Sequence, residues 1–287
     1  MIYQPSGSFS WDRVFRPSLM QRILRSLGLK IDGVIIFLNY LQFAVAIVLL
    51  VWFLPIAWFL RATVGEKATQ PIQPFFGWLW LATFGVYRRA WYHPAIDRNE
   101  NYVYMAEHFN LIDIPLYVST WPTDTRALSA MEYKKIPVYG WLIAAAGTQF
   151  IERRDRQQAI ADLKALGEKM ERENISVLLV PTGTRAVYGQ RPPFKRGTFH
   201  FGVQLKRPIV PMYLVGTENL AIGKNHCKPG RVDVVYGEPI RPEDHPEAFD
   251  SVDALQKLVD KRMQEEGQHL RNNRAALQSG RSEVLSN

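Results

Sequence analysis

A stretch of 28 residues without a charge, Gly33 to Leu60, constrains this chain more than any other feature. Only the uncharged residues Asn39, Gln42 and Pro55 interrupt its apolar character. A helix needs about 20 apolar residues to cross a bilayer, and a buried helix of this length is unusual in a soluble domain. We therefore expect residues 33–60 to form a transmembrane helix.

A second apolar stretch, Pro71 to Tyr87, is shorter, aromatic and broken by proline, and Arg88 and Arg89 follow it directly. It is compatible with a second span, which would complete a helical hairpin, and equally with a re-entrant or surface-lying helix, with the two arginines at the lipid headgroups. We assign residues 1–92 to a basic N-terminus and membrane-anchoring helices.

The distribution of positive charge suggests an orientation. Five basic residues precede the first apolar stretch, whereas the connection after it carries Arg61 and Lys67. By the positive-inside rule the N-terminus is then cytoplasmic, and a hairpin would return the rest of the chain to the cytoplasmic face. A single complete span would place the rest on the opposite side.

The net charge of +8 and the pI of about 9.5 indicate an anionic partner, such as a nucleic acid, a membrane surface or a phosphorylated or acidic substrate. The basic residues are dispersed rather than interleaved with aromatic residues, so we expect no nucleic acid among the partners. The single cysteine, Cys227, excludes an intrachain disulfide and fits a reducing compartment.

From about residue 98 the sequence alternates between strand-like and helix-like segments, which is typical of an α/β domain. The expected strands are 102–106, 126–130, 149–151, 175–180, 208–215 and 232–236, and the expected helices are 112–120, 137–146, 156–173 and 252–263. The segment 175–180 is entirely apolar, as in the central strands of parallel sheets. We predict a domain over 93–271 with a central, largely parallel sheet flanked by helices, and a disordered tail over 272–287.

One polar pair stands at the end of the first expected strand. His108 follows the apolar run 102–106, and Asp113 comes five residues later at the start of an expected helix. A carboxylate that binds one ring nitrogen leaves the other nitrogen able to take a proton from a substrate hydroxyl. Taken alone, such a pair is more often an ordinary loop histidine beside a carboxylate.

Three further blocks follow in order. Phe150-Ile-Glu-Arg153 ends a short strand in a cation, and Pro181-Thr-Gly-Thr-Arg185 is a turn that offers backbone N–H groups and a guanidinium to a phosphate. Lys195 and Arg196 add two cations beside a glycine, and Ile209-Val-Pro211 begins another strand. Each block alone also fits a solvated cation or an ordinary turn.

In this order and spacing, the blocks around His108 and Asp113, Gly147 to Arg153, Pro181 to Arg185 and Ile209 to Pro211 resemble those of the glycerolipid acyltransferases. That family includes the membrane-bound 1-acylglycerol-3-phosphate (lysophosphatidate) acyltransferases. The resemblance covers about residues 98–240. It implies transfer of a fatty acyl chain from acyl-CoA or acyl-carrier protein to a lysophospholipid hydroxyl, without a metal or other cofactor.

The resemblance also implies roles for individual residues. His108 would be the general base for the acceptor hydroxyl, and Asp113 would orient it. The residues expected to bind the acceptor phosphate and neighbouring substrate groups are Arg153, Gly183, Thr184, Arg185, Lys195 and Arg196.

The sequence departs from the family pattern at three positions. Glu107 stands where Asn is common, Asn110 where Ser or Thr is common, and Thr182 where Glu is common. We treat all three as possible accessory residues, and one hypothesis is that Glu107 supplies the acidic group missing at Thr182. The departures leave open another acceptor, such as glycerol-3-phosphate or another lysolipid, and a non-catalytic lipid-binding relative.

Overall fold

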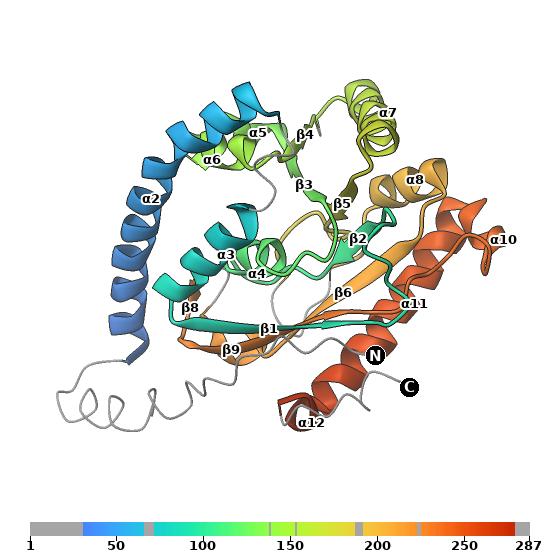
Figure 1. Ribbon diagram of the computed structural model, residues 1–287. Coiled ribbons are helices and arrows are strands. Elements are labelled where there is room, and N and C mark those ends of the chain that lie inside the picture. Colours follow the sequence, from blue (N-terminus) through green and yellow to red (C-terminus); the bar gives the residue numbers. More distant parts are fainter. Residues whose placement is uncertain are drawn as a thin grey trace.

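The computed structural model of the protein describes residues 31–65, 72–137, 139–152, 154–186, 192–222 and 225–278. Within them, a seven-stranded sheet with the order β1-β9-β6-β2-β5-β3-β4 lies at the centre, and helices cover both of its faces (Figure 1). Neighbouring strands run parallel except for β6 and β9. This confirms the predicted α/β class with a largely parallel central sheet flanked by helices.

The strands of the central sheet are β1 (Val86–Tyr92), β2 (Val103–Ala106), β3 (Thr125–Ala130), β4 (Gln149–Ile151), β5 (Ser176–Leu179), β6 (Ile209–Val215) and β9 (Gly230–Tyr236). A separate antiparallel pair consists of β7 (Ala221–Ile222) and β8 (His226–Cys227). The helices are α2 (Ile31–Thr63), α3 (Ile72–Thr83), α4 (Asp113–Val118), α5 (Met131–Lys134), α6 (Tyr139–Ala145), α7 (Arg156–Glu173), α8 (Arg196–Leu205), α9 (Thr217–Leu220), α10 (Pro246–Phe249), α11 (Val252–Asn272) and α12 (Arg274–Gln278).

Side-chain alternation along β2 divides the core into two layers. Val103 and Met105 join a cluster with residues of α7, α8 and α11, whereas Tyr104 and Ala106 join a second cluster with residues of α3 and α4. All four side chains are buried, as expected for a strand in the middle of a sheet that is covered on both faces. The second layer matters for function, because it brings α3 and α4 to the end of β2 where His108 lies.

The clearest predicted helix, α7, has the bounds that its periodicity indicates, and both ends have a local cause. Asp155 caps the N-terminus by accepting hydrogen bonds from the backbone of Gln157 and Gln158. At the other end Asn174 adopts the left-handed conformation, with φ of 54°, which ends the helix. The chain then enters the buried strand β5.

The edge strand β1 corrects the expectation that Arg88 and Arg89 lie at lipid headgroups. β1 pairs in parallel with β9 and is part of the central sheet, whereas the sequence predicts that the α/β domain begins at residue 93. Arg88 donates to the Ser119 hydroxyl at 2.6 Å, and Arg89 forms an ion pair with buried Asp233 at 3.0 Å. Both guanidinium groups are therefore bonded within the domain.

Residues 33–60 do form one helix, within α2. Across the described part of the chain, however, no helix is both long enough and apolar enough to span a membrane, so the predicted transmembrane helix is not confirmed. One side of α2 packs on α3, α6 and β8. On that side Asn39 is buried and accepts a hydrogen bond from the Cys227 backbone at 2.7 Å.

The C-terminal segment is more ordered than predicted. Helix α11 continues to Asn272 instead of ending near residue 263, and α12 follows it where a disordered tail was expected. Leu277 is completely buried, and its carbonyl oxygen accepts a hydrogen bond from Arg89. Residues 279–287 lie outside the described residues.

Candidate active site

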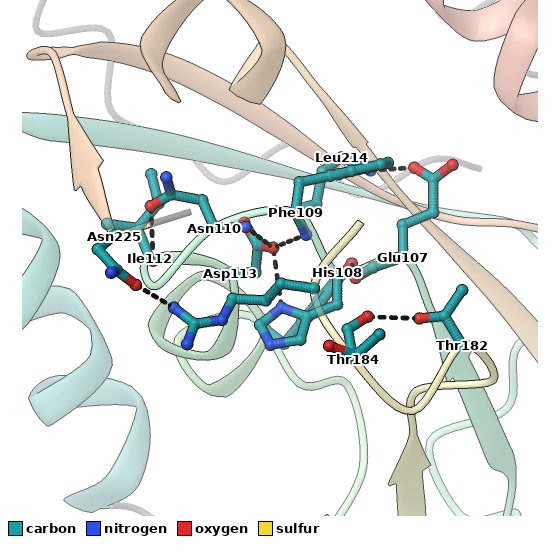
Figure 2. A network of polar contacts seen from close by, with 12 residues as sticks. Glu107, His108, Phe109, Asn110, Ile112, Asp113, Thr182, Thr184, Leu214 and Asn225 are labelled. Carbon is teal, nitrogen blue, oxygen red and sulfur yellow. Dashed lines mark hydrogen bonds and ion pairs between the residues drawn. The ribbon is translucent and has the colours of Figure 1, made fainter. Parts of the chain in front are cut away.

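His108 and Asp113 are brought together as predicted. Nδ1 of His108 lies 3.0 Å from Oδ2 of Asp113, which is fully buried, while the imidazole keeps a side-chain exposure of 17% (Figure 2). The backbone N–H groups of Phe109 and Asn110 donate to the same carboxylate oxygen. With an ionised Asp113, Nδ1 carries the hydrogen and Nε2 keeps a lone pair that accepts a proton.

The loop that carries His108 is held by contacts on both sides. The His108 carbonyl oxygen accepts from the Ala186 backbone at 2.8 Å. Asn110 is completely buried and donates from Nδ2 to the His226 carbonyl at 3.0 Å, so its role is to position the loop. Tyr117 donates its hydroxyl to the Glu107 carbonyl, and burial, with a smaller effect of the Asp113 charge, raises the pKa of that hydroxyl well above its ordinary value.

A cavity of about 740 Å³ lies beside this pair. His108 and the turn residues 183–185 line it together with apolar side chains from several elements, including Ile114, Leu128, Ile143, Leu163, Leu179 and Phe201. The space thus combines a base, a cation and a large apolar volume, which suits a substrate with an anionic end and a long apolar chain.

The turn after β5 departs in one respect from its expected role. Gly183 has a positive φ of 65°, and its N–H donates to the Val180 carbonyl at 2.9 Å, so this amide closes the turn. The Thr182 hydroxyl donates to the Thr184 carbonyl at 2.7 Å and also stays within the turn. Thr182 does not line the described cavity, whereas Thr184 and Arg185 do.

The structure separates the predicted cations. Arg185 lines the cavity, and its guanidinium donates to Oδ1 of Asn225 at 2.6 Å. Lys195 lines the cavity too and packs against Gly183: a Cβ added at this glycine would lie 3.2 Å from Cδ of Lys195. Arg196 instead forms an exposed ion pair with Asp253 at 2.8 Å, outside the cavity.

Arg153 lies outside the described residues. The structure does not bring the Glu107 carboxylate to the cavity, because its side chain points away from His108 (Figure 2). The Glu107 carboxylate forms an ion pair with Arg271 at 3.0 Å and accepts from the Leu214 backbone at 3.3 Å, so it joins the end of β2 to α11.

Sequence reasoning missed the contribution of α3 and of Asn225. Helix α3 packs so tightly on α4 that a Cβ at Gly77 would lie 2.8 Å from the Pro115 carbonyl oxygen. This contact brings Gln73, Phe76 and Trp80 to the cavity. No local pattern reveals these residues, because their segment reads as a membrane-associated stretch.

The residues of the site define a class of chemistry. A buried carboxylate orients an imidazole beside an apolar cavity, and a guanidinium lines the same cavity. Such a set suits transfer of an apolar acyl group to a hydroxyl. Across the described ranges, no group of His, Cys, Asp and Glu side chains is arranged to hold a metal ion.

Comparison with known proteins agrees with this class. Residues 91–215 match the family model described as Acyltransferase. This part of the chain is therefore similar to the acyltransferase family, in agreement with the ordered sequence blocks.

Among curated proteins, the chain is 34% identical over 148 residues to the 1-acyl-sn-glycerol-3-phosphate acyltransferase of Cocos nucifera. The aligned residues make up 51% of this chain and 48% of that protein. It is 32% identical over 125 residues to the enzyme of the same name from Saccharomyces cerevisiae, covering 43% and 41% of the two chains. The chain thus spans about half the length of the curated relatives it matches.

Among solved structures, the crystal structure of the 1-acyl-sn-glycerophosphate (LPA) acyltransferase PlsC from Thermotoga maritima superposes with a TM-score of 0.69. The match covers 83% of this chain and 97% of that one, at 23% sequence identity. The two proteins therefore share their fold.

Proposed function

We propose that the protein transfers a fatty acyl chain from acyl-CoA or acyl-carrier protein to the hydroxyl of 1-acylglycerol-3-phosphate, forming phosphatidic acid. The observation that carries the proposal is the placement of the His108–Asp113 pair and Arg185 around one largely apolar cavity. The similarity to the 1-acyl-sn-glycerol-3-phosphate acyltransferases of Cocos nucifera and Saccharomyces cerevisiae supports this acceptor.

In the proposed reaction Nε2 of His108 takes the proton of the acceptor hydroxyl while the oxygen attacks the thioester carbonyl carbon. The tetrahedral intermediate collapses, the carbon–sulfur bond breaks, and the leaving thiolate takes the proton back from His108. The products are an ester and a free thiol. Asp113 keeps Nδ1–H in place and stabilises the imidazolium that forms between the two proton transfers.

The acceptor phosphate is bound by Arg185 and Lys195 in this proposal, with Thr184 beside them. A guanidinium forms strong charge-assisted hydrogen bonds with phosphate, and a fixed phosphate holds the acceptor hydroxyl near its base. We retain Arg153 as a further phosphate contact. The apolar lining, which includes Leu128, Ile143 and Leu163, accommodates a fatty acyl chain of the substrates.

The three departures from the family pattern do not favour a non-catalytic relative. Asn110 bonds the His226 carbonyl of β8, and Thr182 bonds the Thr184 carbonyl within its own turn. Glu107 bonds Arg271 and the Leu214 backbone. None of the three departures lines the described cavity. The departures therefore leave the proposed catalytic groups in place.

We further propose that the domain works on the cytoplasmic face of a membrane, with α2 against the lipid. Large apolar side chains of this helix are exposed, among them Phe37 at 70%, Trp52 at 76% and Phe59 at 67%. Together with the net charge of +8, such a surface suits an anionic bilayer.

Sedimentation with anionic phosphatidylglycerol vesicles tests the membrane proposal. The double variant Trp52→Asp, Phe59→Asp is expected to lose most of its vesicle binding. Ile160→Asp, which changes an exposed apolar residue on α7, serves as the control and is expected to bind like the wild type. Equal binding by all three proteins would contradict a role for α2.

The function itself is tested by incubating the protein with labelled oleoyl-CoA or oleoyl-acyl-carrier protein and a panel of acceptors. The panel contains 1-acylglycerol-3-phosphate, other lysophospholipids and glycerol-3-phosphate. We expect transfer to 1-acylglycerol-3-phosphate that is absent from His108→Ala. Transfer to another acceptor alone would change the proposed substrate. No transfer to any acceptor, with lipid binding retained, would favour a non-catalytic lipid-binding protein.

A further inference from the structure

The side chain of Gln73 is unusual for a buried glutamine. Its relative exposure is 4%, and neither Nε2 nor Oε1 has a hydrogen-bond partner within the described residues. Buried amide groups are nearly always paired, because leaving them unpaired costs stability. An exception in a folded protein calls for an explanation, and a bound ligand is one.

The position of Gln73 indicates where that ligand lies. On α3, Phe76 follows Gln73 by three residues and Trp80 follows Phe76 by four, so the three side chains share one face of the helix. All three line the cavity that contains His108. The indole Nε1 of Trp80 is also buried without a partner in the described structure. Two uncharged polar groups are thus unpaired on the cavity-lining face of α3.

The surroundings of Gln73 limit the chemistry of the ligand. The cavity residues that α3 and α4 contribute are uncharged, and Ile114 and Val118 are apolar. The cations that suit a phosphate, Arg185 and Lys195, come from other segments. An unpaired amide among apolar side chains suits a neutral oxygen, such as the ester or thioester carbonyl oxygen at the end of an acyl chain.

We propose that the amide N–H of Gln73 donates a hydrogen bond to the carbonyl oxygen at the root of an acyl chain bound in the cavity. This inference rests on the proposed function, in which two such oxygens are present. One belongs to the ester of the lysophospholipid acceptor, and the other belongs to the thioester of the donor. In either case Gln73 is a substrate-positioning residue beside the proposed phosphate and hydroxyl contacts.

The test compares the wild type with Gln73→Met, which preserves size and removes both polar atoms. Gln264→Met makes the same change at an exposed position on α11 and is the control. Each protein is assayed with 1-acylglycerol-3-phosphate and with its 1-O-alkyl analogue, an ether that lacks the carbonyl oxygen.

If Gln73 binds the acceptor ester, Gln73→Met lowers kcat/KM for the ester-linked acceptor about three- to tenfold and leaves the ether-linked acceptor unchanged. If it binds the donor thioester, the KM for oleoyl-CoA rises by a similar factor with both acceptors. In both cases the Tm stays the same or rises, because an unpaired buried amide has been removed. Values within twofold of wild type for every substrate would overturn the proposal, as would a lower Tm with unchanged KM values.

Binding measurements separate this inference from the proposed function. If the wild type transfers no acyl group, the proposed function fails, and the two lysolipids and oleoyl-CoA are titrated while the Tm is followed. The Gln73 contact would still be supported if the ester-linked lipid or oleoyl-CoA raises the Tm of Gln73→Met less than it raises the Tm of the wild type. The ether-linked lipid should then raise the Tm of both proteins equally. Identical responses of the two proteins to all three ligands would overturn it.

Discussion

Replacing Asp113 by asparagine keeps the shape of the side chain and removes its charge. In the structure Oδ2 of Asp113 accepts hydrogen bonds from His108 Nδ1 and from the backbone of Phe109 and Asn110. The amide oxygen of asparagine can occupy the same place, so the loop keeps its conformation. The contact with His108 then becomes a neutral hydrogen bond instead of a charge-assisted one.

The magnitude follows from this geometry. His108 becomes positively charged during the proposed reaction, and the fully buried carboxylate 3.0 Å away stabilises that charge. Losing a charged partner at this point is expected to lower kcat about 10²- to 10⁴-fold. The variant also places an NH₂ group where Oδ1 is buried without a partner among the described residues, which costs about 1–3 kcal/mol of unfolding free energy.

The assay is the rate of phosphatidic acid formation at saturating substrates, with urea unfolding measured in parallel. Asp253→Asn makes the same change at an exposed ion pair and is expected to retain the wild-type kcat. If Asp113→Asn is folded and retains more than half of the wild-type kcat, the reasoning about His108 and its carboxylate is refuted.

Three further predictions follow from the site and its surroundings. Glu107→Gln weakens the ion pair with Arg271, so it should lower the unfolding free energy by about 1–3 kcal/mol while kcat stays within threefold of wild type. A sharp loss of kcat without a loss of stability would contradict this. Arg185→Ala should raise the KM for the acceptor at least tenfold, whereas Arg196→Ala should not change it; equal KM values would remove Arg185 from the phosphate site. Burial raises the pKa of Cys227 to about 12, so roughly one thiol in 10,000 is ionised at pH 8. The native protein should therefore resist labelling by iodoacetamide until it is unfolded, and rapid labelling of the native protein would contradict this.

The parts of the site that the sequence revealed are local. His108 and Asp113 lie five residues apart at the exit of one strand, and Arg185 follows the next buried strand in a turn. Parallel strands end at a common edge of the sheet, but strand order alone does not say which strands are neighbours. The resemblance of the ordered blocks to the glycerolipid acyltransferases is what predicted a shared site for these groups.

The contacts that the sequence did not reveal join distant segments. Glu107 bonds Arg271 and Arg185 bonds Asn225, and neither partner carries a pattern that distinguishes it from a solvated residue. Gln73 belongs to an apolar stretch whose sequence predicts membrane association. Only the packing of α3 on α4 brings this side chain to the cavity.

The N-terminal elements show a second limit of sequence patterns. Freedom from charge over residues 33–60 predicted a helix correctly, yet it does not say what surrounds the helix. Buried Asn39, which bonds the Cys227 backbone, is one of the residues that tie α2 to the domain. Likewise Arg89 in β1 finds its partner, Asp233, far along the chain.

The central claim is that His108 is the base of an acyl transfer, and its most direct test is the rate of transfer from oleoyl-CoA to 1-acylglycerol-3-phosphate by wild type and His108→Ala. The two proteins should have similar Tm values, since the ring is partly exposed and contacts the solvent-accessible cavity. We predict a kcat for His108→Ala at least about 10³-fold below wild type. A folded His108→Ala protein with a kcat within tenfold of wild type would contradict the claim.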